Sequence, residues 1–177
     1  MIEEALRPYI RDIVDFPKPG IVFKDITPLL QQPELVKKAV DEFVRRLSCT
    51  QIDVIAGIES RGFLFGFLLA QAMNKPFVPI RKQGKLPFHT VSESYKLEYG
   101  QATIEMHEDA IQQGTRVLLH DDLLATGGTV IAASKLVEKL GGQIAGYTFV
   151  INLEFLQSTG RLTRFSDRII SLLSYTE

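Results

Sequence analysis

Hydrophobic positions along the chain alternate between a spacing typical of helices and a spacing typical of buried strands. After Pro33, which suits the first position of a helix, apolar residues recur every three or four positions and form one stripe. This stripe consists of Val36, Val40, Phe43, Val44 and Leu47. Asp53–Ile58 is a short apolar run of the kind found in strands that are covered on both faces, and Gly62–Met73 predicts a strongly apolar helix.

The same alternation continues to the end of the chain. The pattern predicts strands over Phe77–Arg81, Arg116–His120 and Ala145–Ile151, a helix over Thr129–Leu140, a helical turn near Glu154 and a last apolar run over Ile169–Leu173. Strands that alternate with helices are typical of an α/β fold, so we expect a mainly parallel central sheet flanked by helices. No internal repeat or linker divides the chain, and residues 1–177 are expected to form one domain.

Two segments depart from this alternation. Glu3–Ile13 predicts a short helix, after which prolines and a glycine break the chain before a short extended piece at Ile21–Phe23. Lys82–Gly100 is rich in charge, glycine and aromatic residues, and it predicts a long loop or a small hairpin. A loop of this length inside a compact domain is usually functional or mobile.

Composition and charge narrow the classes of function. With 20 basic and 21 acidic residues the net charge is −1, which gives no support to binding of nucleic acid or of a membrane surface. The single Cys49 excludes an internal disulfide and a cysteine-rich metal site. The longest apolar segment, Phe63–Ala70, is too short to span a bilayer, and the acidic N-terminus lacks the core of a signal peptide. We therefore expect a cytoplasmic enzyme.

The most informative segment is Val117–Thr129, where an apolar strand ends in two adjacent acids and a small-residue loop leads into a helix. A helix N-terminus offers unpaired N–H groups to a phosphate, and Gly127 and Gly128 let the backbone approach a ligand closely. The carboxylates suit ribose hydroxyls or a metal held through them. A sugar that carries a 5′-phosphate satisfies both halves of the segment. The alternative is an ordinary strand, loop and helix with polar turn residues.

A second polar turn, Ile58–Gly62, follows the strand at Asp53–Ile58 in the same way. It has a glycine at the start of a helix, and Arg61 could hold a further anionic group with two hydrogen bonds. The alternative is that Glu59 and Arg61 only solvate the turn. A second phosphate-type site beside the first makes this alternative less plausible.

The Val117–Thr129 segment resembles the phosphoribosyl pyrophosphate motif of the type I phosphoribosyltransferases, although His120 stands where that family usually has an aliphatic residue. On an alternating strand, we expect His120 to face a polar contact rather than the core. The turn at Glu59–Gly62 resembles the pyrophosphate loop of the same family, which points to a non-proline cis peptide at Glu59–Ser60. The resemblance implies the type I phosphoribosyltransferase fold with a small hood and a flexible lid loop.

Three more segments resemble the adenine phosphoribosyltransferase family in particular: Phe16–Pro28, Ile80–Pro87 and Ser94–Gly100, together with a tail at Tyr175. With the two loops above, the resemblance covers nearly the whole chain. It implies purine salvage, in which the 5-phosphoribosyl group of phosphoribosyl pyrophosphate is transferred to adenine N9 to give AMP and pyrophosphate. It also implies a base-binding hood over residues 1–30, a flexible catalytic loop over residues 82–100 and a homodimer.

The resemblance assigns roles to individual residues. The 5′-phosphate and ribose are expected at Asp121, Asp122, Ala125, Thr126, Gly127, Gly128 and Thr129. Pyrophosphate is expected at Glu59, Ser60, Arg61, Arg81, Lys82 and Lys85. Adenine is expected between Phe23 and Phe155, with backbone groups of Val22 and Lys24 at its edge. The expected catalytic residues are Glu98, which would exchange a proton with the purine imidazole, Asp121 and Asp122. A Mg²⁺ ion is expected to be held mainly by the substrate, without a dedicated protein cage.

Several of these residues also have ordinary explanations. Phe23 and Phe155 could pack in a core, the basic residues between Arg81 and Lys85 could solvate a loop, and Glu98 could lie on the surface. The rival activities are a transferase for 6-oxopurines, against which the Val22–Lys24 segment argues, and a non-catalytic sensor of phosphoribosyl pyrophosphate. A sensor would often carry a DNA-binding domain or a basic face, and neither is found in this sequence.

Overall fold

The structure is a computed structural model, and it describes residues 1–96 and 100–177. Seven strands form one sheet in the order β5-β6-β4-β3-β7-β8-β9, and two more, β1 and β2, form a separate hairpin. The strands of the main sheet are β3 (Val54–Ile58), β4 (Phe77–Lys82), β5 (Thr90–Lys96), β6 (Gln101–His107), β7 (Arg116–Leu124), β8 (Gln143–Leu153) and β9 (Ile169–Tyr175). Neighbours from β4 to β9 run parallel, whereas β6 and β5 join antiparallel at one edge. The predicted mainly parallel sheet is confirmed.

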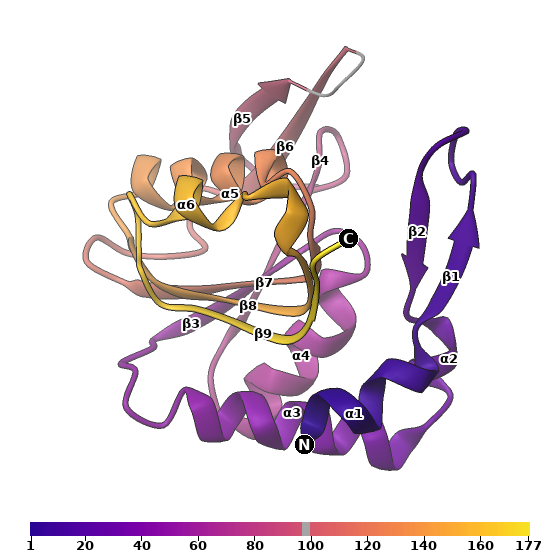
Figure 1. The fold of residues 1–177 in the computed structure, drawn as a ribbon. Coiled ribbons are helices and arrows are strands. Elements are labelled where there is room, and N and C mark those ends of the chain that lie inside the picture. The colour runs from indigo at the N-terminus through magenta and orange to yellow at the C-terminus, as the bar shows by residue number, and fades with distance from the viewer. Residues whose placement is uncertain (97–99) are drawn as a thin grey trace.

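Helices cover both faces of this sheet (Figure 1). α1 (Ile2–Leu6), α3 (Pro33–Arg46) and α4 (Gly62–Ala72) lie on one face, and α5 (Gly128–Lys139) and α6 (Thr159–Leu162) lie on the other. Two short 3-10 helices, η1 (Arg7–Tyr9) and η2 (Glu154–Leu156), and the single turn α2 (Thr27–Leu30) complete the described elements. Because side chains alternate along a strand, Leu118 enters the core under α3 and α4, while Val117 and Leu119 enter the core under α5.

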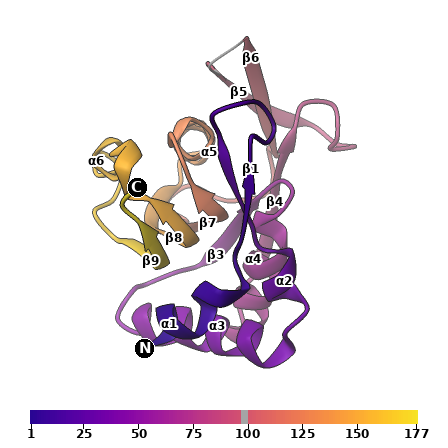
Figure 2. The same cartoon turned by 45° about the vertical axis from the view of Figure 1, so that its right-hand side comes forward.

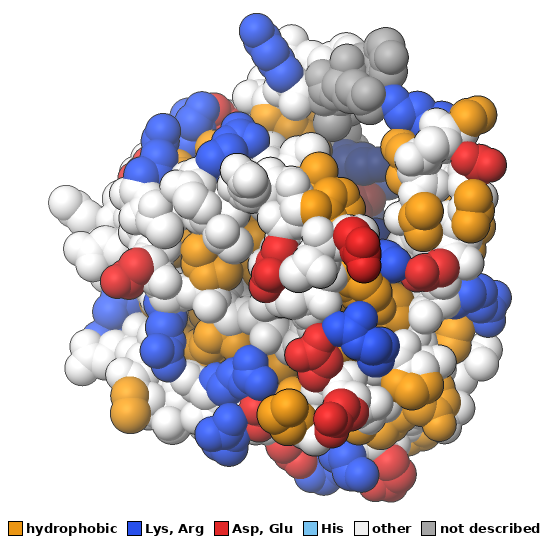
Figure 3. All heavy atoms as spheres, in the orientation of Figure 1, with side chains coloured by type: hydrophobic (Ala, Val, Ile, Leu, Met, Phe, Trp, Pro, Cys, Tyr) orange, Lys and Arg blue, Asp and Glu red, His pale blue; other side chains and the backbone are white. Residues whose placement is uncertain are grey.

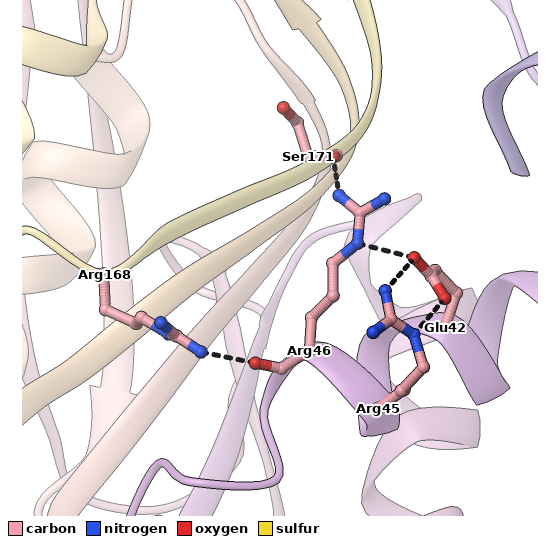
Figure 4. A network of polar contacts seen from close by, with 5 residues as sticks. All are labelled: Glu42, Arg45, Arg46, Arg168 and Ser171. Carbon is pink, nitrogen blue, oxygen red and sulfur yellow. Dashed lines mark hydrogen bonds and ion pairs between the residues drawn. The ribbon is translucent and has the colours of Figure 1, made fainter. Parts of the chain in front are cut away.

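The C-terminal end of α3 is tied to β9 by a polar network (Figure 4). Arg46 donates from Nη1 to the backbone oxygen of Ser171 at 2.9 Å, and its Nε donates to Glu42 at 2.8 Å. The guanidinium of Arg168 caps the backbone oxygen of Arg46. Cations at a helix C-terminus satisfy carbonyls that have no partner in the helix, so this network fixes α3 on the edge of the sheet.

The N-terminal segment differs from its prediction. The expected helix over Glu3–Ile13 ends early, because the chain passes through η1 and then forms β1 (Arg11–Val14), which pairs with β2 (Val22–Asp25). Pro8 lies in η1 and cannot donate a helical hydrogen bond, and the pairing with β2 supplies partners that a helix would otherwise need. The hairpin stands beside the main sheet and above α2 (Figures 1 and 2).

Of the two structures expected for Lys82–Gly100, a long loop or a small hairpin, the described residues support the hairpin. β5 and β6 pair antiparallel from Thr90–His107 to Lys96–Gln101. Glu98, the predicted proton-exchanging residue, lies outside the described residues, and the expected mobility of this segment stays a prediction.

Candidate active site

The site lies at the carboxyl ends of β3 and β7, the two neighbouring strands from which the chain continues to opposite sides of the sheet. From β3 the chain moves to β4 on one side and later returns to β7 on the other, so the loops after β3 and β7 leave the sheet in opposite directions. In open α/β sheets a crevice at the carboxyl ends of such a strand pair binds ligands. A hollow opens between the β1–β2 hairpin and the body of the protein, with basic side chains visible inside it (Figure 3).

Asp121 and Asp122 do not follow the end of their strand, as the sequence suggested, but lie inside it. β7 continues to Leu124, and Asp121 still pairs with Phe149 of β8. The pairing of β7 with β3, however, ends at Gly57 and His120. The acids therefore stand where β7 extends beyond its neighbour, which gives them one paired side and one side that faces the crevice.

The two carboxylates are crowded and poorly hydrated. Asp122 is only 3% exposed, and one oxygen of Asp121 accepts the backbone N–H of Asp122 at 2.9 Å. Gly62 lets the start of α4 lie directly against this part of β7, since a Cβ there would stand 2.9 Å from the His120 carbonyl oxygen and 3.0 Å from an Asp121 carboxylate oxygen. Burial raises the pKa of Asp121 well above its usual range, and the charge of Asp122 adds to the shift. Burial also raises the pKa of Asp122, opposed by the nearby Arg61 guanidinium.

Arg61, at the N-terminus of α4, joins three parts of the predicted site. Its Nε lies 2.9 Å from an Asp122 carboxylate oxygen, and its Cζ lies 4.7 Å from the centroid of the Phe23 ring. The predicted ribose acid, pyrophosphate loop and base-stacking ring are thus in contact through one side chain. Contact with pyrophosphate itself stays a prediction.

Glu59 gathers the basic residues predicted to meet pyrophosphate. Its carboxylate accepts hydrogen bonds from Lys85 Nζ at 2.8 Å, the Lys82 backbone N–H at 2.9 Å and Arg81 Nε at 3.2 Å. Burial raises the pKa of Glu59, but the three donors outweigh it and lower the pKa to about 2. Glu59 thus holds these three groups together, and its assignment to the pyrophosphate site stays a prediction. The peptide Glu59–Ser60 is cis, as expected.

The loop Ala125–Thr129 leads into α5, which begins at Gly128, one residue earlier than predicted. Gly127 has a φ of +78°, and a Cβ there would stand 3.3 Å from the Cβ of the buried Ser158. Arg161 donates to the backbone oxygen of Thr126 at 2.8 Å. These contacts fix the conformation of the loop, which leads into the first N–H groups of α5, groups of the kind that bind a phosphate.

The base end of the site lies on the hairpin. Phe23 meets Phe16 edge-on, with ring centroids 5.2 Å apart, as well as Arg61. The side chain of Lys24 points away from this surface, since its Nζ binds both oxygens of Asp12 at 2.8 and 2.9 Å and lies 4.0 Å from the centroid of the Tyr175 ring. Only its backbone is left for a base. Phe155 lies on η2 directly after β8 and is 48% exposed, so core packing does not explain it.

Sequence reasoning missed three supporting residues. Arg161 lies in a segment without a periodic pattern, and Asp12 lay in a helix prediction that was wrong. Glu93 of β5 binds Lys135 at 3.0 Å and Lys139 at 2.6 Å, which ties the β5–β6 hairpin to the helix of the phosphate loop. Glu93 occupies one of the half-buried positions that alternate with exposed ones along β5, a pattern seen only in the structure.

His120 was expected to avoid the core, and this was wrong, although its polar contact exists. The ring is fully buried between Phe43 and Phe65, and Nδ1 lies 2.9 Å from the Thr148 hydroxyl. Among the described residues its Nε2 has no hydrogen-bond partner. Burial lowers the pKa of His120 to about 3, so the ring is neutral and serves packing.

Comparison with known proteins agrees with this geometry. A model of the family "phosphoribosyl transferase domain" matches residues 27–157. The adenine phosphoribosyltransferase of Cytophaga hutchinsonii is 51% identical and aligns over 99% of this chain and 97% of its own. The crystal structure of the Thermoanaerobacter pseudethanolicus enzyme of that name superposes with a TM-score of 0.93 at 45% identity, covering 99% of this chain and 100% of its own. That of Saccharomyces cerevisiae, complexed with an imino-altritol bisphosphate and adenine, superposes with a TM-score of 0.89 at 38% identity, covering 97% and 98%.

Proposed function

Because the chain belongs to the phosphoribosyltransferase family, among the adenine phosphoribosyltransferases, we propose that it transfers the phosphoribosyl group of phosphoribosyl pyrophosphate to adenine N9 in purine salvage, giving AMP and pyrophosphate. The observation that carries the proposal is the continuous contact from Asp122 through Arg61 to Phe23. The residues proposed for ribose, pyrophosphate and base are thus adjacent, which supports a reaction in which base and pyrophosphate are exchanged at one carbon of the ribose.

The proposed reaction breaks the bond from the anomeric carbon to pyrophosphate and forms the bond to N9. The transition state has oxocarbenium character, so negative charge near the sugar favours it. Asp121 and Asp122 bind the ribose hydroxyls, and the loop Ala125–Thr129 holds the 5′-phosphate. Arg81, Lys82 and Lys85 receive the charge of the leaving pyrophosphate together with Arg61 and the Ser60 backbone.

The proposed base site uses Phe23 and Phe155 on the two faces of adenine, with the backbone of Val22 and Lys24 at its edge. Residues 1–30 form this hood, and residues 82–100 form a lid that excludes water. Glu98, in that lid, exchanges the proton at the imidazole ring. Glu98→Gln is expected to lower kcat by about 10²–10⁴ with little change in substrate binding.

We propose Mg²⁺ as the metal, which would neutralise the charge of bound pyrophosphate. The paired acids fit such an ion, because carboxylates are hard oxygen ligands. Burial destabilises their ionised forms, and a nearby cation would stabilise these forms again. Among the described residues no group of three or more metal-ligating side chains occurs, so the substrate would supply most of the ligands.

The test is to incubate the protein with phosphoribosyl pyrophosphate, Mg²⁺ and each of adenine, hypoxanthine, guanine and xanthine. We expect AMP from adenine and no product from the other bases. A 6-oxopurine transferase would invert this result, and a sensor would bind phosphoribosyl pyrophosphate without forming a nucleotide. Full activity in excess chelator would reject the metal.

We also propose a homodimer in the cytoplasm that binds no nucleic acid. In the described part of the chain, no helix is long and apolar enough to cross a membrane.

α4 exposes Leu64, Phe67 and Leu68 by 41–52%, and a second copy of the chain is the partner we propose for this face. Phe67→Glu is expected to give a monomer by light scattering. The free, exposed Cys49 suits a reducing compartment.

A further inference from the structure

Arg61 contacts two groups that the proposed substrates would also use. The guanidinium lies over the face of Phe23, on which adenine is proposed to stack, and beside Asp122, which is proposed to bind ribose. The side chain is 34% exposed, so it spans the crevice rather than extending into solvent.

A guanidinium and a purine compete for the same kind of surface. Both are flat, and both stack on an aromatic face. Phe16 already lies against the Phe23 ring at an interplanar angle of 78°, so this ring has two planar neighbours before any base arrives. An adenine that stacks on the face covered by Arg61 would have to displace the guanidinium.

The contact between Arg61 and Asp122 is one that a stronger anion can break. Nε and the carboxylate oxygen are 2.9 Å apart, yet among the described residues this oxygen has no partner with hydrogen-bond geometry. Pyrophosphate carries several negative charges and accepts two parallel hydrogen bonds from a guanidinium. It therefore offers Arg61 a better partner than one buried carboxylate.

We propose that Arg61 couples the two substrate sites: it covers Phe23 and neutralises Asp122 in the free protein, and the pyrophosphate group withdraws it. One movement of one side chain then uncovers the base site and frees Asp122 for the ribose. The inference rests on the proposed function. It makes Arg61 a residue that positions the second substrate as well as a ligand of the first.

The experiment is calorimetric titration of adenine with and without magnesium pyrophosphate, which is the probe for the withdrawing anion. For the wild type we expect pyrophosphate to tighten adenine binding by about 5-fold to 100-fold, the usual range for coupled sites. For Arg61→Ala we expect adenine alone to bind more tightly than it binds the free wild type, and pyrophosphate to have no further effect. Wild-type affinity that is the same with and without pyrophosphate would overturn the proposal, as would an Arg61→Ala protein that binds adenine no more tightly.

Two variants separate this role from a general disturbance. Arg61→Lys keeps a positive charge beside Asp122 but has no planar group to cover Phe23, so free adenine should again bind tightly. Arg81→Ala removes a cation of the same region without touching Phe23, and should weaken pyrophosphate while the coupling factor stays as in the wild type. Loss of coupling in Arg81→Ala would contradict the assignment to Arg61. A wild type that forms AMP but shows no coupling rejects this inference alone, whereas a wild type that forms no AMP rejects the proposed function.

Discussion

The loop Ala125–Thr129 and the β1–β2 hairpin, which are proposed to bind opposite ends of the nucleotide, are held in place by different means. The loop Ala125–Thr129 continues from β7 into α5, both of which are embedded in the core, and its shape depends on the positive φ of Gly127. Its backbone is also held from outside by Arg161. The loop is therefore set by main-chain geometry that a ligand does not need to change.

The hairpin instead depends on side chains. Its strands pair with each other and not with the main sheet, and two cation–π contacts join it to the body: Arg61 with Phe23, and Lys24 with Tyr175. Val14, Phe16 and Val22 remain 45–69% exposed on it. Such contacts can break and form again, so under the proposed function the phosphate end of the site is preorganised and the base end is adjustable.

The largest effect is expected at Gly127, where the loop depends on one backbone conformation. Gly127→Val cannot adopt a φ of +78° without strain, and its side chain would meet Ser158. Binding of AMP and of phosphoribosyl pyrophosphate should fall about 100-fold or more, as measured by calorimetry, while free adenine is little affected. Gly114→Val is the matched control, because Gly114 also has a positive φ, of +83°, but lies outside the proposed site, and a Cβ there has nothing within 4 Å. Unchanged AMP affinity in a folded Gly127→Val protein would mean that the phosphate binds elsewhere.

A smaller effect is expected where the two ends meet. Arg61→Ala should weaken phosphoribosyl pyrophosphate about 10-fold to 100-fold, since it removes a charge-assisted contact of roughly 1.5–3 kcal/mol. AMP lacks pyrophosphate, and its base gains the uncovered Phe23 face, so its affinity should stay equal or rise. Competition binding of the two ligands measures the ratio. Equal losses for both would show that Arg61 does not distinguish the pyrophosphate end from the base end.

The same contrast explains how far the sequence predicts the molecule. The sheet, the helices after β3 and β7 and both loops follow from local patterns, because buried strands and phosphate loops are encoded by consecutive residues. The strand at Arg11–Val14 does not, because it is stabilised by β2 and not by its own sequence. The support from Arg161 and the pairing of Arg61 with Phe23 were also invisible, since each joins segments far apart in the chain. The family resemblance supplied the roles of Phe23 and Phe155, which spacing alone leaves open.

Near the phosphate loop, the buried His120 makes the stability of the protein depend on pH. His120, next to the acid pair, has a pKa of about 3 because it is buried, against 6.5 when exposed. Below pH 6.5 the imidazole binds a proton in the unfolded chain but not in the folded protein. The free energy of unfolding is therefore highest above pH 6.5 and decreases as the pH falls toward 3. Between pH 7 and 5 the free energy of unfolding should drop by about 2 kcal/mol from this residue.

Urea unfolding of the wild type and of His120→Leu/Thr148→Val at both pH values isolates this contribution. The double variant removes the ring together with the hydroxyl that it contacts, so no polar group is left alone. All other titrating groups are common to the two proteins. The double variant should lose about 2 kcal/mol less than the wild type over this range, and an equal loss would show that His120 is protonated at no cost in the folded state.

The smallest effect is expected at Tyr175, where the β1–β2 hairpin contacts the body of the protein. Tyr175 lies between two cations, with Lys24 Nζ at 4.0 Å and Arg7 Cζ at 4.7 Å from its ring centroid. Lys24 is adjacent to Phe23 in sequence, so its contact with the Tyr175 ring helps to fix the position of the Phe23 ring. Tyr175→Leu removes contacts of about 1 kcal/mol each and lets the hairpin move, which should raise the KM for adenine about fivefold and leave the KM for phosphoribosyl pyrophosphate unchanged. Tyr175→Phe keeps the ring and should behave as the wild type. A rise in both KM values, or the same rise in Tyr175→Phe, would mean that Tyr175 supports the whole protein or acts through its hydroxyl, and that the hairpin is as fixed as the phosphate loop.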